Sequence, residues 1–322
     1  MTDVHLSSSG VRVPPSATPW AVGVAVAGCV LAMLLRPTFG LYVAEGAGLV
    51  TALAAAGLSM YVVIAPREVP VRRWLRGTAI ALAVTAFAMV LVAVPFDVMV
   101  VAGNGLGGLG NGLARSVVLR SGETETAVLR GIGLVLVVAG FRWHSTRAQW
   151  VAFAGALLVI ASFALVGHAR TESPRVAVTA AVLAHVGAAS AWFGGLLGLG
   201  ISLHQTRGDV GRSGRLIARF ARTMEGVLAL VLAAGVGLAI LYLPNIGAFV
   251  HTAYGQVLLV KLAVLSAVLL VSAANHLRLV SMARCGNAAA IRVLRTNIAV
   301  EQIGLLAIFA ITAVLMRQDP RA

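Results

Sequence analysis

The 322-residue sequence has little charge, and most of that charge is positive. Only 11% of its residues are Asp, Glu, Lys or Arg, whereas a soluble domain carries about 25%. Because a soluble fold needs charged side chains at its surface, this composition excludes an ordinary globular domain in water. Hydrophobic residues make up 59% of the chain, so most of the surface must face lipid.

Cysteine and catalytic motifs are also scarce. Cys29 lies in the first apolar run and Cys285 in a basic segment, and neither has a Cys-x-x-Cys neighbour. This excludes a disulfide framework and a typical structural zinc site. The glycine-rich run 103–108 lacks the Lys-Ser/Thr of a phosphate-binding loop, and GxSxG and HExxH motifs are absent. We therefore do not expect an enzyme.

The net charge of +14 would suggest a nucleic-acid partner if the chain were soluble. Here the basic residues lie almost entirely between apolar runs. Cationic loops held against anionic lipid headgroups explain them, so membrane lipid is the expected partner and nucleic acid is not.

Apolar runs long enough to cross a bilayer recur along the chain. About 20 residues span the hydrocarbon core, and in lipid the backbone of such a run is satisfied by a helix. The runs are 19–35, 42–65, 77–101, 126–141, 149–167, 177–203, 220–243, 254–279 and 296–316. The sequence thus predicts an all-α, polytopic integral membrane helix bundle of about nine transmembrane helices.

The basic residues predict the orientation of this bundle. With the N-terminus inside, 16 of the 25 Lys and Arg residues fall in cytoplasmic segments and seven in outer segments. The other two, Arg130 and Lys261, lie within spans. Since cytoplasmic loops carry the excess of positive charge, we predict an inside N-terminus and an outside C-terminus.

The same pattern suggests an organisation of the chain. Residues 1–18 are expected to be a disordered N-terminal lead, and 19–150 to hold four spans with an outer glycine-rich loop at 102–125. Residues 151–316 hold five further spans, and 317–322 form a tail.

Several metal-binding residue types are predicted near the outer ends of the spans. They are Asp97, Met99, His168, His185, His251 and Lys261. Imidazole, carboxylate and thioether groups together suit copper, although a protonated lysine cannot be a ligand. His168 and His185 end and begin consecutive helices, so they could face one another. The alternative is that the histidines are ordinary interfacial residues and that Lys261 reaches outward to water.

A second polar layer is predicted at the inner ends, and it contains Glu225, Asn275, His276 and Glu301 beside Arg219, Arg222 and Arg295. An ionisable group at the centre of a membrane helix costs at least ~2.5–3.5 kcal/mol, so each needs a reason. One reason is structural, because buried carboxylates pair with arginines and hold helices together. The other is a cytoplasmic exit station or a proton-coupling site.

Five segments resemble those of a known family in the same order. They are 162–168 with its terminal Gly-His, 184–185 with the next histidine, 191–197 with Trp-Phe-Gly-Gly, 254–261 with Tyr-Gly and a lysine, and 295–301 with a glutamate. They resemble the membrane domain of the copper resistance protein D family. The resemblance covers most of residues 160–316, and the first four spans match loosely. Ala221 stands where the family usually has serine.

The resemblance implies copper handling in a bacterial cytoplasmic membrane, with a copper ion as the ligand. Family members are thought to pass copper from the outer face toward the cytoplasm, often with a small extracytoplasmic copper-binding protein. In the leading copper hypothesis His168 and His185 are the outer metal ligands, and His251, Asp97 and Met99 are auxiliary ligands. The implied supporting residues within the membrane are Lys261, Tyr254, Trp192, Glu225, His276 and Glu301.

Two other functions are compatible with the sequence. Histidines of neighbouring helices could hold haem in a membrane electron carrier. The protein could also be an assembly factor for a copper enzyme that transports nothing itself. We keep copper transport or delivery as the leading hypothesis.

Overall fold

The computed structural model describes residues 36–64, 72–143, 145–165, 173–243, 245, 247–316 and 318. Within these ranges it contains eight helices long and apolar enough to cross a membrane. They are α2 (Pro37–Ile64), α3 (Arg72–Ala102), α5 (Gly122–Arg142), α6 (Thr146–Ser162), α8 (Arg175–Gln205), α9 (Val210–Tyr242), α11 (Ala253–Ala274) and α13 (Ala288–Leu315). Six short helical segments join or extend them: η1 (Gly105–Gly110), α4 (Gly112–Leu119), η2 (Phe163–Leu165), α10 (Ala248–His251), η3 (Asn275–Val280) and α12 (Ser281–Arg284).

The eight helices confirm the predicted spans from 42–65 onward, one helix for each run. The first predicted span, 19–35, lies outside the described residues, and the ninth span stays a prediction. The helices are longer than the apolar runs. At α9 the reason is that a polar residue caps the helix well before its apolar run begins. Asp209 begins α9 by accepting a 2.8 Å hydrogen bond from the Arg212 amide, ten residues before the apolar run at 220.

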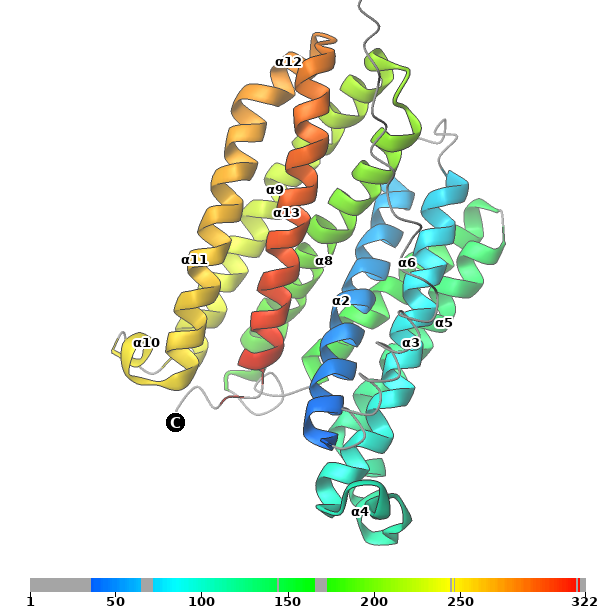
Figure 1. The fold of residues 1–322 in the computed structure, drawn as a ribbon, viewed down its shortest axis with the longest axis vertical. Coiled ribbons are helices and arrows are strands. Elements are labelled where there is room, and N and C mark those ends of the chain that lie inside the picture. The colour runs from blue at the N-terminus through cyan, green and yellow to red at the C-terminus, as the bar shows by residue number, and fades with distance from the viewer. Residues whose placement is uncertain are drawn as a thin grey trace, which may run out of the picture.

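The spanning helices alternate in direction, so their connections collect at two ends of the bundle (Figure 1). The short helices α4 and α10 lie at one end, and α12 lies at the other. The connections at the α12 end contain the arginine-rich segments 72–76, 207–222 and 278–295. This distribution is the one on which the predicted orientation depends.

The segment 102–125, predicted as a glycine-rich loop, contains the helices η1 and α4. Asn111 begins α4, because its side-chain oxygen accepts hydrogen bonds from the amides of Leu113 (3.0 Å) and Ala114 (3.1 Å). Ala114 and Val118 of α4 are buried in one cluster with Val98 of α3. The segment therefore packs against the end of α3, where Figure 1 shows it beyond the other helices.

Helices α2 and α8 cross where both have a glycine. A Cβ atom on Gly57 would overlap the Ser190 carbonyl, and one on Gly194 would overlap the backbone of Leu58. The Ser190 hydroxyl fastens the crossing by donating a 2.7 Å hydrogen bond to the Leu53 carbonyl. Gly194 therefore permits the close approach of α2 and α8.

Candidate functional site

His185 lies on α8 and is turned toward α9. Its Nδ1 atom is 3.0 Å from the backbone oxygen of Val231. Since a carbonyl oxygen can only accept a hydrogen bond, Nδ1 carries the proton and Nε2 keeps its lone pair. Histidine ligands of metals are commonly held this way, with one ring nitrogen donating to a carbonyl and the other free to bind. The geometry therefore prepares Nε2 of His185 as a ligand.

Gly235 makes this position of the imidazole possible. A Cβ atom at residue 235 would lie 3.1 Å from Cε1 and 3.3 Å from Nδ1 of His185. Those distances are shorter than ordinary van der Waals contact, so a side chain at 235 would push the ring away from α9. The glycine acts as a positioning residue for His185.

Lys261 of α11 lies close enough to His185 to act on it electrostatically. The remaining predicted partner, His168, lies outside the described residues, so the structure does not test the proposed pair. The ammonium group is a neighbour of the candidate ligand and not a ligand itself.

The other predicted ligands are spread over two elements. Asp97 and Met99 belong to α3, and Met99 is buried with Leu41 and Phe96 in an apolar cluster. His251 is exposed at the end of α10. Figure 1 shows α10 and the end of α3 on opposite sides of the bundle. Within the described ranges, no three His, Cys, Asp or Glu side chains come together to hold a metal ion.

The predicted inner layer contains a buried chain of hydrogen bonds. Asn297 donates from Nδ2 to Oδ1 of Asn275 at 2.6 Å, and Asn275 donates from Nδ2 to Oε1 of Glu301 at 2.6 Å. Glu301 is 4% exposed and Asn275 is 5% exposed. Glu301 is thus held by an amide, and not by the arginine that the structural interpretation expected.

Asn275 and His276 begin a π-helical turn, η3 (Asn275–Val280), that joins α11 to α12. Such turns are rare and occur frequently at functional sites. His276 Nε2 lies 3.4 Å from the Glu225 carboxylate of α9. The inner layer therefore connects α9, the π-helical turn and α13.

A cavity of about 400 Å³ lies beside this layer, between α8, α9, α11, η3 and α13. Its walls are mostly apolar and include Trp192, which is 3% exposed. The polar residues that line it are Glu225, Ser272, Asn275, His276 and Glu301. A large apolar pocket with a few convergent polar groups is the usual form of a binding site.

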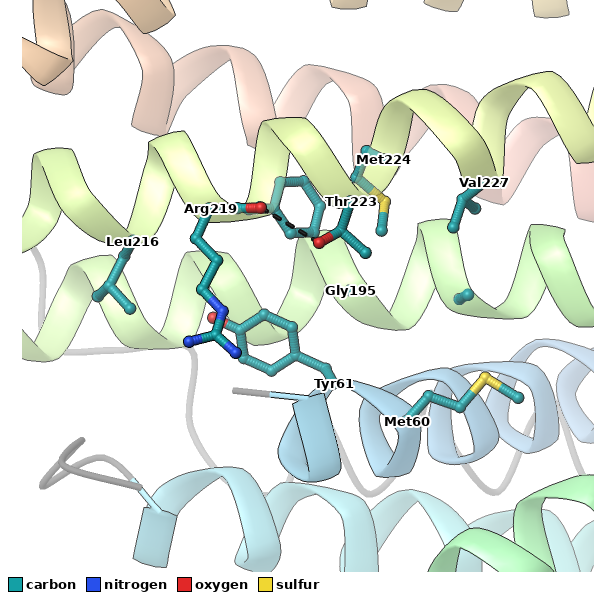
Figure 2. A pocket seen from close by; sticks show the side chains of 10 residues that line it. Met60, Tyr61, Gly195, Leu216, Arg219, Thr223, Met224 and Val227 are labelled. Atoms are coloured by element: carbon teal, nitrogen blue, oxygen red, sulfur yellow. Dashed lines mark hydrogen bonds between the residues drawn. The ribbon is translucent and has the colours of Figure 1, made fainter. Parts of the chain in front are cut away.

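A smaller cavity of about 60 Å³ lies between α2, α8 and α9 (Figure 2). Figure 2 shows the Arg219 side chain extending from α9 toward Tyr61 of α2. The Tyr61 hydroxyl is 3.2 Å from the Ser202 hydroxyl of α8. Phe220 and Met224 line both cavities, so the two spaces are neighbours.

Tyr254, the remaining predicted supporting residue, lies near the start of α11. It is 6% exposed and packs in a small apolar cluster with Leu243, Ala248 and Leu315. This position is near the predicted outer end of the bundle, on the same helix as Lys261 but almost two turns before it.

Three features of the site were not found from the sequence. They are the positioning glycine Gly235, the amide of Asn297 that orients Asn275, and the contact of Tyr61 with Ser202. A polar residue inside an apolar run was the available signal for Asn297. Gly235 gave none, because a glycine between alanine and valine in an apolar helix is ordinary.

The apolar exteriors, the spanning helices and the buried polar groups define a polytopic α-helical membrane protein. Residues 214–315 match the family model of copper resistance protein D (CopD), so this part of the chain is similar to the membrane domain of that family. No curated protein and no solved structure matches it.

The family match covers only part of the earlier resemblance. It includes 254–261 and 295–301, and therefore Tyr254, Lys261 and Glu301. It begins after 162–168 and 191–197, so His168 and His185 lie outside it. Their role as ligands stays a prediction that rests on chemistry and geometry.

Proposed function

We propose that the protein binds copper at the outer face of the cytoplasmic membrane and transports it, or delivers it, toward the inside. The observation that carries this proposal is the imidazole of His185, fixed by the Val231 carbonyl so that Nε2 can bind a metal. The CopD-family match supports copper as the metal.

In this proposal His168 supplies the second imidazole, and Asp97, Met99 and His251 are auxiliary ligands. Lys261 adjusts the charge beside the bound ion. A small extracytoplasmic copper-binding protein would supply the copper. Imidazole and thioether groups suit copper, which makes this donor set chemically consistent.

Copper binding by the purified protein tests the site. We expect wild-type protein to bind copper and the His185→Ala and His168→Ala/His185→Ala variants to lose that binding. His204→Ala is a matched control, because this exposed histidine lies on the same helix at its opposite end. Equal copper affinity in wild type and in the folded double variant would exclude the outer site.

Copper uptake by proteoliposomes separates transport from delivery. Accumulation inside vesicles, lost in the double variant, would establish transport. Copper binding without accumulation would instead favour a delivery or assembly role. A Soret band in the visible spectrum of the purified protein would favour the haem alternative.

A further inference from the structure

Glu301 is a buried carboxyl group without a cationic partner in the described part of the chain. Its hydrogen-bond partners are the neutral amide of Asn275 and the neutral hydroxyl of Ser272. Arg295 lies six residues earlier on the same helix, about 240° around the axis, and so faces away from Glu301. An isolated buried carboxylate is very costly, so the carboxyl is expected to carry a proton unless a cation lies beside it.

The hydrogen bonds leave a defined place for that proton. Asn297 occupies the Asn275 oxygen, which turns the Asn275 NH₂ group toward Oε1 of Glu301. The Ser272 hydroxyl is a second neutral hydrogen-bond partner of the carboxyl group, and a hydroxyl oxygen can accept a hydrogen bond from a protonated carboxyl. Glu301 also lines the cavity of about 400 Å³, which is large enough for several water molecules or a hydrated ion.

The Glu225–His276 pair lines the same cavity on its more open side. The side chains of Glu225 and His276 are 61% and 45% exposed, whereas Glu301 is 4% exposed. A carboxylate and a neutral imidazole each have a lone pair that can accept a proton. A route for protons therefore leads from an exposed pair, through the cavity, to a buried carboxyl.

We propose that Glu301 is a proton-exchange site of the copper pathway. When copper enters the cavity, the O–H bond of the Glu301 carboxyl group breaks and the carboxylate balances the charge of the cation. The proton passes to His276 or Glu225 and then to the solution on the inner side, with no change of oxidation state. The inference rests on the proposed function, since copper is the cation that the site would exchange for a proton.

The helices packed around α13 differ in whether they bring a titratable side chain into the cavity. Helices α8 and α11 contribute no titratable side chain to the cavity, and α9 and η3 contribute Glu225 and His276. On α2, Tyr61 contacts Ser202, and Arg284 of α12 is exposed. Neither lines the cavity. The proton exchange is therefore assigned to Glu301 and to this one pair.

Infrared difference spectroscopy of the protein in lipid vesicles tests the protonation directly. We expect a band of a protonated carboxyl group in wild type that disappears in Glu301→Gln, which keeps the shape and the oxygen that accepts from Asn275. Glu123→Gln, an exposed change in the first turn of α5, is the matched control and should keep the band. A band that persists in Glu301→Gln would overturn the proposal.

A second measurement tests the exchange. Addition of copper to wild type should release about one more proton per bound ion than addition to Glu301→Gln, measured with a pH dye. Copper binding at His185 should be the same in both proteins. Equal proton release in the two proteins would refute the exchange but leave the outer site intact. If the wild-type protein bound no copper, the proposed function itself would be refuted.

Discussion

The N-terminal helices α2 and α6 and the C-terminal helices α9 and α11 use similar apolar sequences in different ways. In the most apolar stretches, 61% of α2 and 50% of α6 is buried inside the bundle, against 6% of α9 and 11% of α11. The N-terminal helices thus form a dense scaffold. The C-terminal helices enclose the larger cavity and present most of their surface to lipid.

Polar groups differ between the two regions in the same way. In the N-terminal region, Arg130 donates from Nε to the Ser162 hydroxyl at 3.1 Å, and its guanidinium lies 4.4 Å from the ring centre of Phe163. These two contacts stabilise the buried guanidinium group within the protein. In the C-terminal region, Nδ1 of His185 is held by the Val231 oxygen while Nε2 stays available, and Glu301 is held by the neutral side chains of Asn275 and Ser272. The buried cation of the first region holds helices together, whereas the polar groups of the second region belong to the candidate sites.

The largest expected effect on stability comes from placing a larger side chain in the dense packing of the N-terminal helices. A Cβ on Gly140 of α5 would overlap the backbone of α6 at Ala148 and Ala152. Gly140→Leu should therefore destabilise the protein by about 3 kcal/mol, as overpacking does in a core without free space. Thermal unfolding in detergent measures it. Gly226→Leu on α9, where nothing lies within 4 Å, is the control, and equal losses in both variants would contradict the comparison.

The next effect concerns the position of His185. Gly235→Val should displace the imidazole and weaken copper binding about 10- to 100-fold, the usual cost of disturbing a group that orients a metal ligand. Gly237→Val lies two residues away in open space and should bind copper as the wild type does. Copper competition titrations would show this, and unchanged affinity in Gly235→Val would mean that the imidazole is not the ligand.

A smaller effect is expected from the inner hydrogen-bond chain. Asn297→Ala leaves Oδ1 of the buried Asn275 without its donor, which should cost about 1–2 kcal/mol. The exposed neighbour Thr296→Ala should cost much less. Unfolding measurements on both variants test the difference, and the protonated-carboxyl band of Glu301 should shift in Asn297→Ala alone.

The smallest effect is expected on the lipid-facing surface of the C-terminal region. Ile240 of α9 is 73% exposed within the protein, so Ile240→Ala should change stability by less than about 0.5 kcal/mol. Thermal unfolding in detergent measures this as well. A loss as large as that of a buried residue would show that another protein surface covers α9.

The spans were predictable because hydropathy depends on neighbouring residues in the sequence. The helix containing Arg130 was the shortest predicted run, and it is a full helix over Gly122–Arg142 because Ser121 caps its start. The helices α4 and η1 were not predicted. Their helical form depends on the cap at Asn111 and on packing against α3, which glycine content obscured.

The site was predictable only in part. The expected depths of His185 and Glu301 follow from the predicted topology, which assigns each residue a level in the membrane. Their partners did not follow, because Val231 is 46 residues from His185 and Asn275 is 26 residues from Glu301. The facing sides of two helices depend on how they pack and, for Asn275, on the π-helical turn.

The sequence by itself determined the class of protein, the spans from 42–65 onward and the excess of arginine at one end. Those properties come from the transfer of residues between water and lipid, which each segment feels on its own. The tertiary structure decided that Gly235 holds His185 against α9 and that Glu301 pairs with an amide beside a cavity. Such contacts join residues far apart in the chain, and only the packed helices bring them together.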